Sequence, residues 1–563
     1  MIKSKASLLW LIPLVFLAVF YFYPLSSILG LSFARGDAGG QAFFQALTQP
    51  SVRRVVGFTI WQAALSTLVT LIVGLPGAYL LGRYRFRGKT WFRAVTGIPF
   101  VMPTLVVAAG FNALLGPTGW VNALAMRWFA LDVPPIQFVN TFQAIIAAHV
   151  FYNTTIVLRL VGDFWARLDP RMAQAAQMLG ASRWYTLRHI TFPLLMPAIA
   201  AAALLVFIFD FSSFAVVLVL GGPQYATIEV EIFYQTTSLF NLPLAASLSL
   251  IQLLCTLGLT VAYTRLSARV SRPLTQRSAV VTQHPLRTRR ERWGARVIIA
   301  GTLLLLTTPL LALAARSFIN LSPQRTRDGT LEQGMTLAFY QALGENPQNS
   351  AFYAPPSRAI AVSLGYAAAT VTLALLLGLP TAWLLAGRAT LLTKIVDPLI
   401  MLPLGTSAVT LGLGFIISLN RPPLDLRTSP LLIPIAHTLV AFPFVVRSLT
   451  PALRSIQPVL REAAAVLGAS PREVVRTIDL PLVARAMLVA AVFAFTISLG
   501  EFGATALVSR PEYPTVPVAI YRFLSRPGAL NYGQGLALST ILMVVTAVGM
   551  LAIERFRVGG EEF

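Results

Sequence analysis

Charged residues are scarce in this chain: Asp, Glu, Lys and Arg make up only 12% of its 563 residues, while 56% are hydrophobic. A typical soluble domain carries about 25% charged residues, so the chain lacks the polar surface that a water-soluble protein needs. A single cysteine, Cys255, excludes a disulfide framework and a cysteine-based metal site. The four histidines are too scattered to predict a metal centre, and they are His149, His189, His284 and His437.

Long apolar runs determine the fold class. A helix needs about 20 apolar residues to cross the hydrocarbon core of a membrane. The first run continues through residues 21–24 without a clear cleavage site, so we interpret it as a retained helix rather than a signal peptide. The sequence therefore predicts an all-α polytopic membrane protein. Its twelve expected spans are 8–33, 55–82, 94–116, 140–162, 194–221, 242–264, 297–318, 359–387, 395–419, 430–450, 483–509 and 533–553.

The positive charge follows the predicted membrane topology. The chain has 44 Lys and Arg against 21 Asp and Glu, a net charge of +23. If the N-terminus is cytoplasmic, 31 of those 44 basic residues fall in segments on the cytoplasmic side. This is the positive-inside pattern of a multi-pass inner-membrane protein, and it predicts that both termini are cytoplasmic. The charge therefore needs no nucleic-acid partner, since no basic module with aromatic platforms is present.

The two parts of the chain repeat each other. Residues 74–76, Gly-Leu-Pro, recur at 378–380, and His149 recurs as His437 with an offset of 288 positions. Six spans separate the copies, so both halves keep the same orientation, which is a parallel repeat. A bundle of this kind indicates transport. We expect a first half over 1–264, a basic cytoplasmic linker over 265–296 and a second half over 297–563.

The strongest motif is a pair of cytoplasmic loops in matching positions of the two halves. Residues 170–194 and 458–482 are identical at 11 of 25 positions. In each copy a proline suits a helix start, Ala-rich residues favour a helix, and a glycine, Gly180 or Gly468, suits its end. The pattern predicts a short helix at the cytoplasmic face, with a surface of small residues that another protein could grip.

These loops resemble a known family. The second copy reads Glu462-Ala463-Ala464, three residues, Gly468, nine residues and then Ile-x-Leu-Pro at 478–481. This spacing resembles the signature loop of the membrane subunits of binding-protein-dependent ABC importers. The first copy departs at Gln174 and at Phe192. The resemblance implies two coupling loops, 170–193 and 458–481, that dock on two copies of a cytoplasmic ATP-binding subunit. It also implies an extracytoplasmic substrate-binding protein and a surround of membrane lipid. The docking residues would be Gln174, Ala175, Ala176, Gly180, Glu462, Ala463, Ala464 and Gly468.

We expect no ATPase site, catalytic residue, metal or cofactor in the chain itself. The segment 82–90 ends in Gly-Lys-Thr, but five residues separate its two glycines, where a phosphate-binding loop needs four. That segment follows a membrane helix and reads as a basic inner loop. His149 and His437 lie early in the fourth and tenth spans, and we interpret both as packed polar residues.

Two acids stand out inside predicted spans, where ionisable residues are costly and often functional. Asp210 maps to Ser498, about one helical turn before Glu501. A pair of carboxylates could meet a cation in the pathway, or each could be hydrogen-bonded to a helix end or a neighbouring serine. The candidate pathway residues are Asp210, Ser213, Phe214, Ser498, Glu501 and Phe502.

The outer segments 221–232, 250–254 and 515–521 look like those of fused thiamine importer permeases. Iron(III) importer permeases share the same architecture, and the segment around Glu501 also resembles permeases for molybdate and sulfate. Thiamine is the first substrate hypothesis, with iron(III) second and polyamines or inorganic anions third. The rival class is a secondary transporter that uses Asp210 and Glu501 as a proton or sodium relay, and a third class is a non-transport scaffold.

Overall fold

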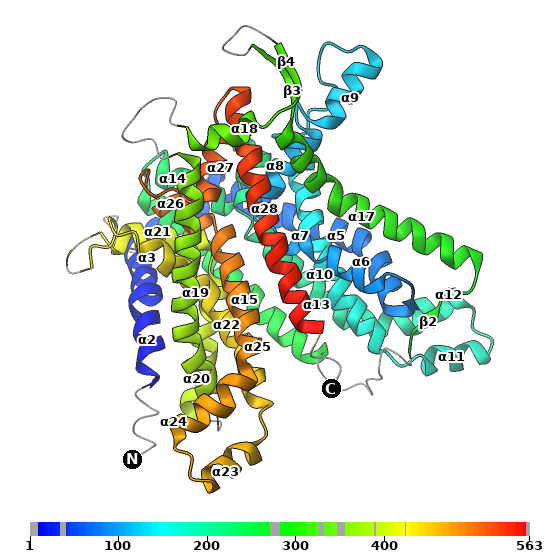
Figure 1. Ribbon diagram of the computed structural model, residues 1–563, viewed down its shortest axis with the longest axis vertical. Coiled ribbons are helices and arrows are strands. Elements are labelled where there is room, and N and C mark those ends of the chain that lie inside the picture. Colours follow the sequence, from blue (N-terminus) through cyan, green and yellow to red (C-terminus); the bar gives the residue numbers. More distant parts are fainter. Residues whose placement is uncertain are drawn as a thin grey trace. The chain divides into compact units, whose positions relative to one another are not determined.

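The computed structural model describes residues 9–33, 41–270, 282–325, 331–345, 355–387, 390–420, 422 and 424–558. These residues are mostly helical, which confirms the predicted all-α membrane fold (Figure 1). The chain forms two compact units, each assembled from separated parts of the sequence. The first unit comprises residues 1–49, 231–253 and 336–563, and the second comprises 50–230 and 254–335.

These units differ from the two halves of the repeat. The first span, Leu11–Phe33, belongs to the unit that holds most of the second half. The seventh span, Arg289–Phe318, belongs to the unit that holds most of the first half. The predicted halves, 1–264 and 297–563, therefore describe the duplication in the sequence rather than the units of contact. Residues 271–281 of the predicted linker lie outside the described residues.

The first unit contains, in chain order, α2 (Leu11–Leu17), η1 (Ala18–Phe22), α3 (Tyr23–Phe33), α4 (Gln41–Thr48), α18 (Ala338–Gln341), η5 (Ala342–Gly344), α19 (Pro356–Ala386), α20 (Leu391–Met401), η6 (Leu402–Gly405), α21 (Ala408–Ser418), α22 (Leu432–Arg454), α23 (Pro458–Val466), α24 (Pro471–Val474), η7 (Val475–Asp479), α25 (Leu480–Gly500), α26 (Gly503–Val508), α27 (Val516–Leu524) and α28 (Ala529–Val558).

The second unit contains, in chain order, α5 (Pro50–Arg83), β1 (Tyr84–Arg85), α6 (Lys89–Val95), α7 (Ile98–Val101), α8 (Thr104–Leu115), α9 (Trp120–Phe129), α10 (Phe142–Arg167), α11 (Arg171–Met178), α12 (Arg183–Thr186), η2 (Leu187–Thr191), α13 (Phe192–Phe211), η3 (Val217–Gly221), η4 (Pro223–Tyr225), β2 (His284–Pro285), α17 (Arg289–Phe318), β3 (Ile319–Arg325) and β4 (Leu331–Met335). Two helices, α14 (Ile228–Thr237) and α15 (Leu242–Val270), contribute residues to both units.

The expected membrane spans agree with the helices. Within the described residues, eleven helices are long and apolar enough to cross a membrane, and a twelfth span is counted if one bent pair crosses as a unit. That pair, Leu391–Gly405 and Ala408–Ser418, covers the predicted span 395–419 and bends by 97°. The third span begins later than predicted, at Thr104, because residues 89–101 form the short helices α6 and α7.

Glycines allow the central helices of each unit to pack closely. A Cβ atom added to Gly74 on α5 would lie 2.8 Å from Val157 Cβ on α10. A Cβ atom added to Gly378 on α19 would lie 2.5 Å from Val445 Cγ1 on α22. Gly74 and Val157 are the repeat counterparts of Gly378 and Val445. The recurring Gly-Leu-Pro motif therefore marks the same close helix contact in both copies, as small residues do in membrane proteins.

The N-terminal helices are tied into the first unit by contacts with residues far along the chain. Leu17 and Tyr21 belong to the same buried cluster as Phe415. The Tyr21 hydroxyl lies 2.7 Å from Thr406 Oγ1, across 385 positions of sequence. Because these contacts join the N-terminal helices to the second half of the chain, the first unit depends on residues from both halves.

Strands are a minor addition to this helical fold. β3 (Ile319–Arg325), directly after α17, pairs antiparallel with β4 (Leu331–Met335). β1 and β2 make a parallel pair of two residues each. The sequence analysis did not predict either pair, since all four strands lie outside the long apolar runs.

Candidate functional site

Both predicted loops contain a short exposed helix that ends at a glycine. We call α11 and α23 the loop helices, and neither has a buried residue. Gly180 and Gly468 follow them with φ angles of +90° and +88°, in the left-handed region that favours glycine. The amides of Ala181 and Ala469 donate to carbonyls five residues earlier, which closes the two helices in the same way. The predicted helix and its glycine end are therefore found in both copies.

Each loop helix carries two large apolar side chains at its exposed tip. Met178 and Leu179 are both 89% exposed, and their repeat counterparts Val466 and Leu467 are both 87% exposed. Exposed apolar pairs of this kind indicate a protein interface. The sequence analysis emphasised the small residues and missed these tips. The signal was present, because both positions stay apolar in the two copies although only the leucine is identical.

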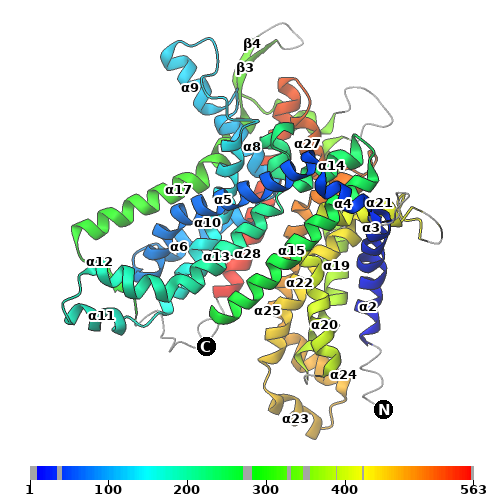
Figure 2. The same ribbon diagram turned by 180° about the vertical axis from the view of Figure 1, so that it is seen from behind.

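The loop helices are joined directly to long membrane helices. In Figures 1 and 2, α11 and α12 lie at one end of α13, and α23 and α24 lie at one end of α25. In each copy a short α-helix and a π-helical turn, η2 or η7, connect the loop helix to the membrane helix. Pro193 and Pro481 then occupy the first turn of α13 and α25. A force on a loop helix therefore acts directly on the end of a spanning helix.

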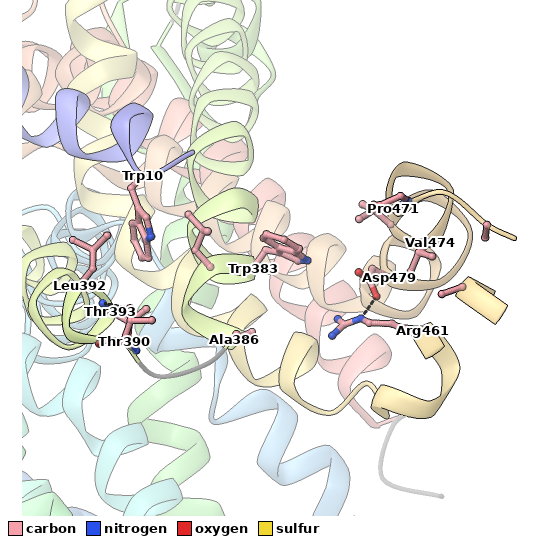
Figure 3. Close-up of a pocket in the computed structure, with 15 residues that line it drawn as sticks. Trp10, Trp383, Ala386, Thr390, Leu392, Thr393, Arg461, Pro471, Val474 and Asp479 are labelled. Carbon is pink, nitrogen blue, oxygen red and sulfur yellow. Dashed lines mark hydrogen bonds and ion pairs between the residues drawn. The ribbon is translucent and has the colours of Figure 1, made fainter. Parts of the chain in front are cut away.

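The second loop has an internal brace that the first loop lacks. Arg461 Nε on α23 donates to Asp479 Oδ1 at a distance of 2.7 Å. Alanine and threonine occupy the equivalent positions, 173 and 191. The brace lines a cavity of about 600 Å³ together with Trp10 and Trp383 (Figure 3). The corresponding pocket behind the first loop has a volume of only about 10 Å³.

We expect Arg461→Ala to loosen the second loop specifically. Asp479 is almost completely buried, so removal of its partner leaves a carboxylate without its charged donor. The half-exposed arginine limits the cost to about 1–2 kcal/mol. Limited proteolysis should cleave the second loop faster, whereas Arg472→Ala in the same loop should not change its cleavage. Arg461→Ala with Asp479→Asn should recover most of the protection, and equal cleavage of all three variants would contradict the brace.

A buried polar cluster lies at the far end of α13 in the second unit. His149 on α10 has its Nδ1 atom 3.0 Å from Ser66 Oγ and 3.4 Å from Asp210 Oδ1. Its Nε2 atom lies 2.8 Å from Ser213 Oγ. Asn153 Nδ2 donates to Asp210 Oδ1 at 2.6 Å. This cluster therefore connects α5, α10 and the end of α13.

The first unit contains a matching cluster at the far end of α25. His437 on α22 has its Nδ1 atom 2.8 Å from Ser498 Oγ, and its Nε2 atom 2.8 Å from Thr505 Oγ1 and 3.3 Å from Glu501 Oε2. Glu501 also accepts the backbone N–H groups of residues 504 and 505, so its carboxylate caps α26. Thr370 on α19 accepts from Ser498 at 3.3 Å.

The structure thus places the predicted pathway residues inside these packed regions. Asp210, Ser498 and Glu501 are buried, and each belongs to a hydrogen-bonded cluster around a histidine. Phe214 and Phe502 are buried as well, and Ser213 is partly exposed. Sequence reasoning found both acids but did not connect either one with a histidine, because the histidines lie on a different helix.

The basic inner loop 82–90 is a structural turn. Lys89 Nζ donates to the carbonyls of Leu81 and Tyr84, at 2.6 and 3.0 Å, and so satisfies the end of α5. Burial and the neighbouring charge of Arg93 lower the pKa of Lys89 to about 8. Among the described residues, no group of three His, Cys, Asp or Glu side chains is placed to hold a metal ion.

Comparison with known proteins finds one family in both halves of the chain. The family described as "Binding-protein-dependent transport system inner membrane component" matches residues 74–272 and 374–557. The thiamine transport system permease protein ThiP of Escherichia coli is 27% identical over 89% of this chain and 88% of its own length. A probable ABC transporter permease of Sinorhizobium fredii is 27% identical over 96% of this chain and 95% of its own length. A crystal structure of a bacterial ABC transporter for alginate covers 48% of this chain and 98% of its own, with 18% identity and a TM-score of 0.41.

Proposed function

Because the chain belongs to the family of inner membrane components of binding-protein-dependent transport systems, we propose that it forms the translocation pathway of a thiamine importer. Family members are multi-pass permeases of ABC importers that have no ATPase site of their own. A cytoplasmic ATPase must therefore supply the energy. We infer that the two loop helices are the coupling helices on which two ATPase copies dock, with both termini on the same side.

The repeated loop carries this proposal. Both copies present an exposed helix with an apolar tip, and both copies continue into a membrane helix. An apolar tip suits a groove on a partner protein, because docking there buries its apolar side chains without leaving buried charges unpaired. Docking residues by this proposal are Gln174, Ala175, Ala176, Gly180, Glu462, Ala463, Ala464 and Gly468.

The same geometry suggests how energy reaches the membrane. When ATP brings the two ATPase copies together, the coupling helices move with them and pull the ends of α13 and α25. The two halves then rock so that access alternates between the two faces of the membrane. Because both halves are fused in one chain, one copy of the permease binds two ATPase copies. The first coupling helix carries Gln174 where the second carries Glu462, and both side chains are exposed, so the two docking contacts differ in charge.

Thiamine is favoured by similarity over most of the chain. The ThiP proteins of Escherichia coli, Salmonella typhimurium and Brucella abortus are each 27% identical to it over about nine-tenths of its length. The outer segments 221–232 and 515–521 point to the same substrate in the sequence. Those segments would meet the binding protein that delivers thiamine to the outer face.

Reconstitution tests the substrate directly. Proteoliposomes that hold the permease and its ATPase, supplied with the binding protein encoded beside it, should accumulate labelled thiamine only when ATP is hydrolysed. Labelled iron(III) should not accumulate under the same conditions, and a non-hydrolysable ATP analogue is the control for energy. Uptake of iron(III), a polyamine or sulfate in place of thiamine would overturn the substrate. Uptake without any ATPase would instead support a secondary transporter.

A further inference from the structure

The two buried histidine clusters have one layout that is repeated in both units. His149 and His437 are repeat counterparts, and so are Ser66 and Thr370. Ser66 on α5 contacts His149, and Thr370 on α19 contacts Ser498 in the other cluster. In both clusters the Nδ1 atom of the histidine faces the equivalent position 210 or 498. In both clusters the Nε2 atom faces position 213 or 501.

The acid changes sides between the clusters. In the second unit Asp210 lies on the Nδ1 side of its histidine and Ser213 lies on the Nε2 side. In the first unit a serine, Ser498, lies on the Nδ1 side and Glu501 lies on the Nε2 side. Each cluster therefore keeps one histidine, one acid and one serine, although the acid has moved by one helical turn. This conserved set between the two halves points to a shared role of the whole cluster rather than of one position.

Both clusters lie at the open end of a helical hairpin whose closed end is a coupling loop. α10 and α13 form the first hairpin, and α22 and α25 form the second. Asp210 is eighteen residues from the start of α13, which corresponds to about 27 Å along a helix. This distance is close to the thickness of the hydrocarbon core. Each histidine on the first helix of its hairpin therefore meets an acid at the far end of the second helix.

We propose that these clusters are latches that hold each coupling hairpin together at the end opposite its coupling helix. The proposal rests on the function proposed above. His149 with Asp210, and His437 with Glu501, join the two helices of a hairpin, while Ser66 and Thr370 extend the contact to a third helix. A pull on the coupling helix then moves the whole hairpin rather than only the helix that continues from the loop.

The burial of the latch groups explains why the clusters would stay closed. Both histidine–acid pairs have side chains no more than 5% exposed. Separation of a hairpin at this end would leave a histidine and an acid unpaired in an apolar surround, which is strongly unfavourable. Five of the contacts around the two histidines and Glu501 are 2.8 Å or shorter, including those of Ser213, Ser498 and Thr505. The latch therefore depends on the whole hydrogen-bonded cluster.

Hydrogen–deuterium exchange on the complex with its ATPase tests this latch. The intact complex is compared without nucleotide and after trapping with ATP and vanadate. In the wild type, amide exchange should change in the coupling loops and also at the hairpin ends, residues 205–217 and 496–508. In Asp210→Asn with Glu501→Gln, the change at the hairpin ends should fall at least about threefold, while the change in the coupling loops stays. ATP hydrolysis should remain within about twofold, whereas thiamine uptake per ATP should fall about tenfold.

A positional swap separates a latch from simple stabilisation. Asp210→Ser alone should break the latch around His149. Asp210→Ser with Ser213→Glu should restore transmission to the hairpin end, because it gives the His149 cluster the layout of the His437 cluster. Thr154→Val on α10 and Thr438→Val on α22 are controls, since each hydroxyl bonds only to its own helix among the described contacts.

Two results would overturn the latch. The first is that, in Asp210→Asn with Glu501→Gln, the nucleotide-dependent change in amide exchange at the hairpin ends is as large as in the wild type. The other is a swap variant that transmits no better than Asp210→Ser while both remain folded, which would leave the acids with a position-bound role such as contact with substrate. A wild-type complex with no nucleotide-dependent change in its coupling loops would instead overturn the proposed function, and the latch with it.

Discussion

Gly468→Asp should abolish uptake while the permease still inserts and folds. Nothing lies within 4 Å of a Cβ atom added to Gly468, so the added Cβ atom itself causes no clash within the permease. The substitution instead strains a left-handed residue by about 1–2 kcal/mol and places a carboxylate beside the exposed apolar tip of α23. When the free loop relieves this strain by leaving its docking conformation, restoring that conformation costs about 1–2 kcal/mol and lowers docking of the ATPase by about tenfold, and charge at the interface adds to it.

Co-purification of the ATPase and uptake into proteoliposomes measure this effect. Gly180→Asp should act in the same way at the first coupling helix, where φ is also left-handed and the space is also open. Gly344→Asp is the matched control, because it is equally uncrowded but lies away from the coupling loops and has no positive φ. Normal ATPase binding by Gly468→Asp would show that this surface is not the docking site.

The second large effect concerns helix packing rather than docking. Gly378→Val should prevent stable folding of the first unit, because its Cβ atom would lie 2.5 Å from Val445 Cγ1 in the contact between α19 and α22. Overpacking of a close contact costs about 1–3 kcal/mol, and a glycine at a helix crossing leaves little room to relax. The melting temperature in detergent and the yield of inserted protein should both fall.

A control in the same helix makes this prediction specific. Gly365→Val also lies on α19, but nothing lies within 4 Å of its added Cβ atom, so its melting temperature should barely change. Gly378→Ala with Val445→Ala should recover much of the loss, because the smaller partner opens space for the new methyl group. Equal loss in Gly365→Val would attribute the effect to β-branching in a helix instead of to the contact with Val445.

The two loop helices were the part of the site most open to prediction from sequence. Their signals are local: a proline at the start, alanines in the helix and a glycine at its end. Both copies form that helix, and both glycines adopt the left-handed conformation. The exposed tips could have been predicted too, since positions 178, 179, 466 and 467 are all large and apolar.

The histidine contacts could not be read from one helix at a time. His149 and Asp210 are 61 positions apart, and only the close packing of α10 against α13 brings them together. The repeat offset maps Asp210 onto Ser498 and Ser213 onto Glu501. That exchange of acid and serine could be interpreted only once the structure placed a histidine between the two positions. The placement of the first span in the first unit likewise depends on tertiary contacts, such as that of Tyr21 with Thr406.

The contact between Tyr21 and Thr406 also sets an order of events at the ribosome. The two residues are 385 positions apart, so at about 5–20 residues per second the N-terminal helix waits about 20–80 s for its partner to be synthesised. During that interval the helix sits in the bilayer with lipid or an insertion factor in place of its eventual neighbours. A chain truncated before residue 406 would therefore leave the Tyr21 hydroxyl without this buried partner.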